Sequence, residues 1–335
     1  SDVRFSATYS DLEPREGEPS EEGDVLGRVR LGLARALTDS WRIGARLSAS
    51  CTSESCRPDT FFDEETQGSA DNSIAFDEAF VHWIQSDRFD LIAGRMQTKF
   101  ITKGGVFAKS MSRNDSNGTR VTWTDGLHAT MKFASGWEPH VILQYNPEDG
   151  PAQITREPLD FTDDDSRVSA FVSLTNEKPV RFLTQRALDI SYYPASLRKD
   201  GLEGESRIED YWGFNARVAG RYPKRSSGRR LRFSMEAAYA PETPTKTGIG
   251  LSGSGDANGF AAAATVAFMD FRRNHSIGIN LAHTGGGWLL SPQYNKNEQL
   301  AEVRYVWVAR DNLTIDFRVR YRKEIDQLIT ACLLY

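Results

Sequence analysis

The stretch Leu313-Thr-Ile-Asp-Phe-Arg-Val-Arg-Tyr-Arg322 alternates without a break between apolar and polar side chains. Successive side chains of a β-strand point to opposite faces, so one face of this segment prefers hydrocarbon and the other is ionic. The pattern therefore predicts an amphipathic strand. We expect one set of its residues to face outward: Leu313, Ile315, Phe317, Val319 and Tyr321. We expect a second set to face inward: Arg318, Arg320 and Arg322.

The same alternation recurs along the chain, and short turns and long polar connectors follow each other in strict order. The expected strands are 3–9, 25–37, 41–50, 74–84, 89–100, 119–135, 140–147, 167–176, 182–194, 208–222, 229–241, 259–271, 275–284, 299–309, 313–322 and 328–335. The expected long connectors are 11–24, 51–72, 101–118, 148–166, 196–207, 243–258 and 285–298.

This order of connectors predicts an all-β fold, namely one transmembrane antiparallel β-barrel of about 16 strands over residues 1–335. Counts of 14 or 18 strands remain open, because the stretches 119–135 and 208–222 can be divided differently. A two-sheet sandwich is the alternative, but it has no reason to collect its long connectors on one rim. Aromatic residues near the expected strand ends fit the two membrane interfaces: Tyr9, Trp41, Trp83, Phe89, Trp123, Tyr192, Tyr193, Tyr222, Tyr239, Phe271 and Trp307.

Composition excludes several classes of protein. No run of 18 apolar residues exists, so a transmembrane helix is not expected. The net charge is -5, and the acids crowd residues 11–24 while arginines dominate the strands, which argues against a nucleic-acid binder. The five histidines lack metal-ligand spacing, and the glycines of 248–255 and 283–287 are best explained as loop residues. We therefore expect no enzyme activity, no cofactor and no metal.

Two segments resemble a known family. Asp77-Glu-Ala-Phe-Val-His-Trp83 followed by Phe89-Asp-Leu-Ile-Ala-Gly-Arg95 resembles the adjacent-strand signature of Gram-negative outer-membrane porins. Ile329-Thr-Ala-Cys-Leu-Leu-Tyr335 resembles the terminal strand that the barrel-assembly machinery reads.

The resemblance implies a multi-pass barrel in the bacterial outer membrane, with short periplasmic turns and long extracellular loops. It also implies that the third long loop, about 101–118, folds into the pore as a constriction. Outer-membrane lipid and lipopolysaccharide would surround the barrel, and porins of this length are commonly homotrimers. The implied function is a water-filled channel for passive diffusion of small hydrophilic solutes and ions.

Basic residues on the inward faces predict a preference for anions, since like charges lining a narrow aqueous pore concentrate counter-ions. The candidate pore-lining and constriction residues are Arg28, Arg30, Arg42, Arg46, Arg95, Lys103, Lys109, Arg113, Arg120, Arg318 and Arg320. A second reading is that many of these bases pair with acids such as Asp77, Glu78, Glu302 or Asp316 and brace the wall. The alternative function is a structural or adhesive barrel that acts through its acidic external loops.

The cysteines allow one cross-link near the start of the chain. Cys51 and Cys56 lie close together in a polar segment and could close a small loop by a disulfide in an oxidising compartment. Two reduced thiols are the other interpretation.

Overall fold

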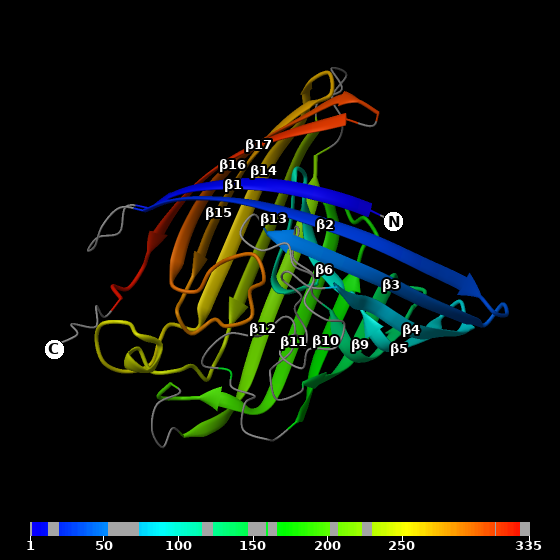
Figure 1. Cartoon of the computed structure of the whole chain (residues 1–335), viewed down its shortest axis with the longest axis horizontal. Helices are drawn as coiled ribbons and strands as arrows, with labels where there is room; N and C mark the ends of the chain where they lie inside the picture. Colours follow the sequence, from blue (N-terminus) through cyan, green and yellow to red (C-terminus); the bar gives the residue numbers. More distant parts are fainter. Residues whose placement is uncertain are drawn as a thin grey trace.

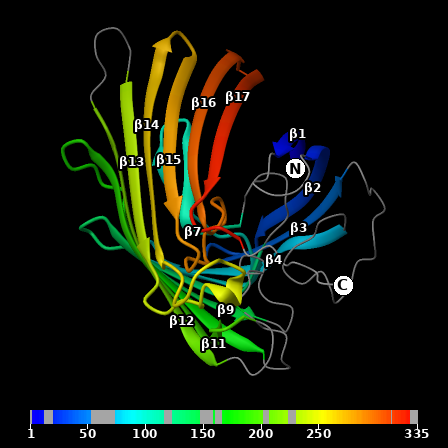
Figure 2. The same ribbon diagram turned by 90° about the vertical axis from the view of Figure 1, so that its left-hand side faces the viewer.

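We analysed a computed structural model of the chain, which describes residues 2–12, 20–52, 74–115, 123–146, 159, 166–201, 207–222, 230–311 and 313–328. The described residues form a sheet of 15 antiparallel strands, with a separate two-stranded hairpin beside it. The sheet curls strongly, so that its last strand comes back towards its first (Figures 1 and 2). Among the described residues, no helix has the length and apolar character needed to cross a membrane.

The strands follow one another in the sheet in chain order, apart from the hairpin strands β6 and β7. Their bounds are β1 Asp2–Leu12, β2 Ser20–Ala36, β3 Trp41–Thr52, β4 Ile74–Ser86, β5 Phe89–Met96, β6 Lys99–Gly104, β7 Phe107–Asn114, β8 Thr124–Met131, β9 Trp137–Asn146, β10 Arg167–Asn176, β11 Leu183–Arg198, β12 Ile208–Arg221, β13 Arg230–Tyr239, β14 Phe260–Arg272, β15 His275–Thr284, β16 Glu298–Arg310 and β17 Leu313–Glu324. One 3₁₀ turn, η2, covers Thr247–Ile249.

This topology confirms the alternation of connectors. Because neighbouring strands are antiparallel, the short connections, such as 37–40 and 273–274, lie at one end of the sheet, which we call the turn end. The long connections, such as 240–259 and 285–297, lie at the opposite end, which we call the loop end. Strands 167–176 and 275–284 match the predicted bounds, and the strand pattern is that of one continuous sheet.

Several predicted boundaries were wrong. The strand expected over 89–100 ends at Met96, and the hairpin strand β6 begins at Lys99. The strand expected over 119–135 is shorter, Thr124–Met131. Part of the connector expected over 11–24 is strand, since β1 extends to Leu12 and β2 begins at Ser20. The strand expected over 328–335 lies outside the described residues except for Leu328, which forms an isolated bridge with Leu251.

The two faces of the sheet differ as the alternation predicts. On β17 the apolar side chains of Phe317, Val319 and Tyr321 are 61%, 72% and 66% exposed on the outer face. On the same strand, Arg318 and Arg320 form ion pairs with the carboxylate of Glu302 in the neighbouring strand β16. Glu302 is buried and also contacts Lys109 of the hairpin. Exposed apolar residues therefore mark the outside of the sheet, and charged residues mark the inside.

Aromatic residues gather at both ends of the strands on the outer face. At the turn end the rings of Trp41 and Trp83 stack 6.1 Å apart, and Phe89 packs on Trp83. At the loop end the rings of Tyr192 and Trp212 lie 4.3 Å apart. These positions suit the two membrane interfaces. Two aromatics named from the sequence were misassigned, because Trp123 and Tyr193 are both buried.

Candidate functional site

The hairpin formed by β6 and β7 lies against the inner face of the sheet (Figure 2). It carries three of the eleven predicted pore-lining and constriction residues, namely Lys103, Lys109 and Arg113. Its base is fixed by the buried carboxylate of Asp115. The backbone N–H of Thr98 donates to this carboxylate at 2.6 Å, and the hydroxyls of Thr98 and Thr124 donate to it at 2.8 and 2.9 Å. The guanidinium of Arg113 donates to Gln144 on β9 at 2.6 Å. Two charged residues at the β7 end, Asp115 and Arg113, therefore tie the hairpin base to the wall.

The tip of the hairpin packs on the wall formed by β13 and β14. A Cβ atom at Gly104 would lie 2.1 Å from the Thr265 hydroxyl and 2.4 Å from the Ser234 hydroxyl, so only glycine fits there. Gly105 has a φ of 77°, in the left-handed region that favours glycine. The two glycines thus allow both the close approach and the sharp reversal of the chain.

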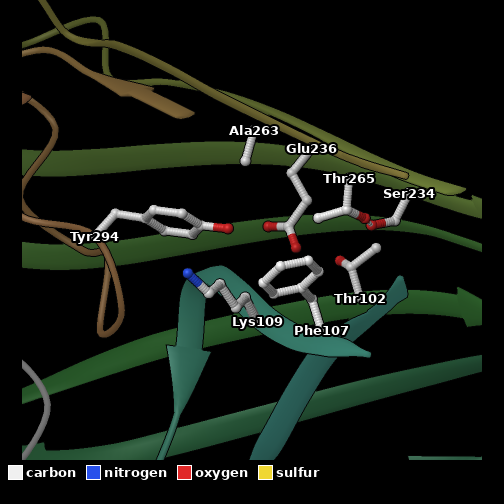
Figure 3. Close-up of a pocket in the computed structure, with 8 residues that line it drawn as sticks. All are labelled: Thr102, Phe107, Lys109, Ser234, Glu236, Ala263, Thr265 and Tyr294. Atoms are coloured by element: carbon white, nitrogen blue, oxygen red, sulfur yellow. Dashed lines mark hydrogen bonds between the residues drawn. The ribbon is translucent and has the colours of Figure 1, made fainter. Parts of the chain in front are cut away.

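The contact between the hairpin and this wall is nearly sealed (Figure 3). A cavity of about 10 Å³ remains there, and it is lined by Thr102, Phe107, Lys109, Ser234, Glu236, Ala263, Thr265 and Tyr294. The backbone N–H of Met111 donates to the Glu236 carboxylate at 2.7 Å beside it. A space of this size holds about one water molecule. At this cavity, the described residues of the hairpin and of β13 and β14 therefore leave no room for a solute larger than water.

Three bases converge on one acid where the hairpin meets β16 and β17. The Lys109 ammonium forms an ion pair with Glu302 and donates to Asn280 at 3.3 Å. Arg318 and Arg320 contact the same carboxylate at 3.0 and 3.2 Å. Burial lowers the pKa of Lys109 to about 8, although the Glu302 carboxylate opposes this shift. Arg318 also lies 3.8 Å from Asp316, which pairs with Arg304. The local formal charge is therefore +2, since four cations face two anions.

Another cluster of ion pairs joins β2, β3 and β4. The buried Asp77 carboxylate lies 2.7 Å from Arg30 and 2.8 Å from Arg46. Arg46 also contacts Glu78 at 2.9 Å and donates to Gln97 at 2.6 Å, which links this wall to the start of the hairpin. Arg28 is fully buried beside this group on β2. These bases are therefore largely neutralised and hold the wall together.

The remaining predicted residues are spread over the molecule. Lys103 pairs with Glu177 at the turn end, and both side chains are more than half exposed. Arg95 pairs with Asp125 at 2.8 Å and lies over the ring of Trp123. Arg42 is exposed on β3. Arg120 lies outside the described residues. Two groups of the predicted residues thus form ion-pair clusters, around Glu302 and around Asp77, and the others lie apart from both.

Arg113 requires a revised role. Its side chain is buried, and it donates to the hydroxyls of Thr98 and Thr124 at 2.8 and 2.6 Å and stacks 5.3 Å from the Phe171 ring. A residue that faces permeating ions must contact water, and this one does not. The bracing interpretation fits Arg113 better than the pore-lining one.

Sequence reasoning missed the buried pair formed by Asp189 and Arg217. Their side chains make two contacts, at 2.6 and 2.8 Å, and the Ser112 hydroxyl of the hairpin donates to Asp189 at 3.1 Å. Both residues lie on the inner face of their strands, β11 and β12, but 28 residues separate them in the chain. Nothing in the sequence pattern indicates that they meet.

Two further predictions concern cysteine and metal. Cys51 is disulfide-bonded, while Cys56 and Cys332 both lie outside the described residues. Within the part of the chain that the structure describes, no cluster of His, Cys, Asp or Glu has the arrangement of a metal site.

Comparison with known proteins shows a similarity to one family over part of the chain. Residues 2–135 match the model of a family described as putative porin. No curated protein matches the sequence significantly.

Solved porin structures share the fold of the whole chain. OprB of Pseudomonas putida is 11% identical, with a TM-score of 0.59 over 96% of this chain and 89% of that chain. A BenF-like porin from Pseudomonas fluorescens Pf-5 is 11% identical, with a TM-score of 0.53 over 96% of this chain and 80% of that one. OccK5 (OpdH) of Pseudomonas aeruginosa is 12% identical, with a TM-score of 0.53 over 97% and 80% of the two chains.

The similarity to porins thus covers the fold of the chain and, in sequence, residues 2–135. The outer face of the sheet carries exposed apolar side chains, and the inner face carries the ion pairs described above.

Proposed function

We propose that this protein is an outer-membrane porin, a closed barrel that forms a water-filled channel for small hydrophilic solutes and ions, with a preference for anions. The passage runs on the side of the hairpin that faces the arginine-bearing strands β2, β3 and β17, because the hairpin contacts β16 through Lys109 and Glu302 and its opposite side packs on β13 and β14. The hairpin thus leaves a basic part of the wall uncovered, and solutes would pass along it.

The observation that carries the anion preference is the cluster around Glu302. The guanidinium groups of Arg318 and Arg320 remain 36% and 39% exposed while they contact Glu302, so water and ions reach them. Lys109 occupies the buried side of the same carboxylate. An excess of two positive charges at the edge of a narrow passage attracts anions and repels cations.

Acidic residues at the loop end act in the opposite direction. The extracellular connectors contain many acids, for example in 11–24, and these gather cations at the mouth. The neck dominates selectivity, because a charge at a narrow passage with protein walls is screened less than one in open solvent. The sign of selectivity therefore follows the Glu302 cluster.

Charge removal at this cluster tests the proposal. We expect the double variant Arg318→Gln/Arg320→Gln to conduct ions in planar bilayers, with a reversal potential in a KCl gradient shifted towards cation preference. The matched control is Arg272→Gln/Arg273→Gln, which removes two exposed charges at the turn between β14 and β15. Equal reversal potentials for the two variants would contradict the role of the cluster. Absence of channels in the unsubstituted protein would contradict the diffusion function itself.

A further inference from the structure

A second connector folds into the interior of the sheet. Residues 285–297 between β15 and β16, which we call the Trp288 loop, carry Trp288, Leu289 and Leu290, and all three side chains are at most 1% exposed. They belong to an apolar cluster with Tyr211 of β12 and Met111 of the hairpin. An apolar cluster inside a wall that is otherwise ionic fills part of the lumen and excludes water there.

A single side chain of the wall binds the backbone of this loop twice. The hydroxyl of Tyr211 donates to the carbonyl of Gly287 at 3.1 Å and accepts from the backbone N–H of Leu289 at 2.9 Å. Tyr211 is fully buried, so water cannot replace either hydrogen bond. Leaving buried backbone groups without partners is costly, and the conformation of residues 287–289 therefore depends on this hydroxyl.

The Trp288 loop in turn holds the hairpin. The indole N–H of Trp288 donates to the carbonyl of Met111 at 3.0 Å. The backbone N–H of Ser110 donates to the side-chain carbonyl of Gln293 at 2.6 Å. These bonds join the loop to β7 along the edge of the hairpin, so the two inward segments form one unit.

Two neighbouring glycines leave the space that this packing requires. A Cβ atom at Gly213 on β12 would lie 2.4 Å from Leu290 and 3.2 Å from Trp288. A Cβ atom at Gly287 would lie 2.5 Å from the Thr243 side chain. The glycine run at 285–287 that resembled an ordinary surface loop in the sequence thus allows the chain to enter the barrel.

We propose that Tyr211 is a positioning residue that keeps the Trp288 loop folded inward, and that this loop is a second element of the constriction, beside the hairpin. The proposal rests on the channel function proposed above. When the Tyr211 hydroxyl is absent, the Trp288 loop leaves its inward position for part of the time. The hairpin then loses its contacts with the loop, and the passage widens.

Thiol labelling measures the position of the loop without any need for channel activity. The variant Leu289→Cys places a thiol at a buried loop position, and a charged, membrane-impermeant maleimide added to the purified protein reports its exposure. We expect slow labelling when Tyr211 is intact. In the combined variant Leu289→Cys/Tyr211→Phe we expect labelling about tenfold faster, which corresponds to about 1.4 kcal/mol in the seating of the loop. The chain without Leu289→Cys gives the background of its own cysteines.

Tyr193→Phe is the matched control, because it removes a hydroxyl from the same apolar cluster. Within the described residues, no hydrogen bond to the loop is made by this hydroxyl, so Leu289→Cys should stay protected in the Tyr193→Phe background. Equal labelling in the two backgrounds would overturn the proposal. Fast labelling of Leu289→Cys with Tyr211 intact would also overturn the proposal.

Single-channel recording on Tyr211→Phe alone gives a second readout that needs no introduced cysteine. We expect a higher mean conductance and added transitions between open levels, neither of which occurs in Tyr193→Phe. Unchanged conductance with unchanged noise in Tyr211→Phe would refute the second constriction element. A protein that forms no channels with or without substitution would refute the diffusion function, while the labelling result would still decide the seating of the loop.

Discussion

At the scale of single residues, the inner wall depends on ion pairs that differ widely in burial. Arg217 and Asp189 are both essentially unexposed and make two direct contacts. We predict that Asp189→Asn lowers the free energy of unfolding by about 3–5 kcal/mol, because the buried guanidinium of Arg217 then lacks a counter-charge. Urea unfolding of the protein refolded in lipid vesicles measures this loss.

An exposed pair supplies the control for that measurement. Lys103 and Glu177 also form an ion pair, at 2.7 Å, but their side chains are 54% and 55% exposed. Glu177→Gln should therefore change the free energy of unfolding by no more than about 1 kcal/mol. If both substitutions cost the same, burial does not determine the strength of these pairs.

At the scale of elements, the width of the passage depends on where the hairpin of β6 and β7 sits. Gly104 touches the Thr265 and Ser234 side chains, whereas Ala108 on the same hairpin is exposed. We predict that Gly104→Val pushes the hairpin tip away from β13 and β14 and opens the sealed side. Ala108→Val should instead leave the hairpin in place, since its side chain meets open space.

Single-channel conductance separates the two hairpin variants. Gly104→Val should change the conductance and broaden its distribution, while Ala108→Val should keep the single value of the unsubstituted protein or reduce it slightly. A conductance that is unaltered by Gly104→Val would mean that the hairpin tip does not border the passage.

The wall strands could be predicted from the sequence, because lipid on one side and water on the other impose a strict alternation. Strand 275–284, with Ile277, Ile279 and Leu281 on one face, shows this clearly. The end of β5 could not be found in the same way. The alternation continues past Gln97 into β6, since a hairpin that packs on a wall has the same period as the wall itself.

The contacts of the site escaped prediction for a different reason. Lys109 and Glu302 are 193 residues apart, and their meeting depends on the path of the hairpin through the lumen. The Trp288 loop was hidden by its glycines, which also suit an exposed loop, and its apolar residues are too few to show a period. The face of a side chain depends on the local alternation, whereas its partners depend on how the whole chain folds.

At the scale of the whole molecule, the sheet exposes apolar side chains on its outer face and carries charged side chains on its inner face, the reverse of a soluble protein. Phe317 and Arg318 are neighbours on β17 and point to opposite faces, one 61% exposed and the other paired with Glu302. We predict that Phe317→Arg impairs assembly much more than Arg318→Phe, because an arginine at mid-bilayer depth on the lipid face costs about 2–4 kcal/mol. The folded fraction of each variant, measured by heat-modifiable mobility on gels, compares them. Equal yields would mean that the two faces are assigned the wrong way round.

The proposed anion selectivity depends on features at all three scales: the charge around Glu302, the inward position of the hairpin and the apolar outer face of the sheet. The reversal potential of the unsubstituted channel in a planar bilayer with a KCl gradient is therefore the most direct test. We predict that the sign of this reversal potential indicates faster permeation of chloride than of potassium. A sign that indicates faster permeation of potassium would show that the acidic mouth, rather than the basic neck, controls the passage, and would contradict the account.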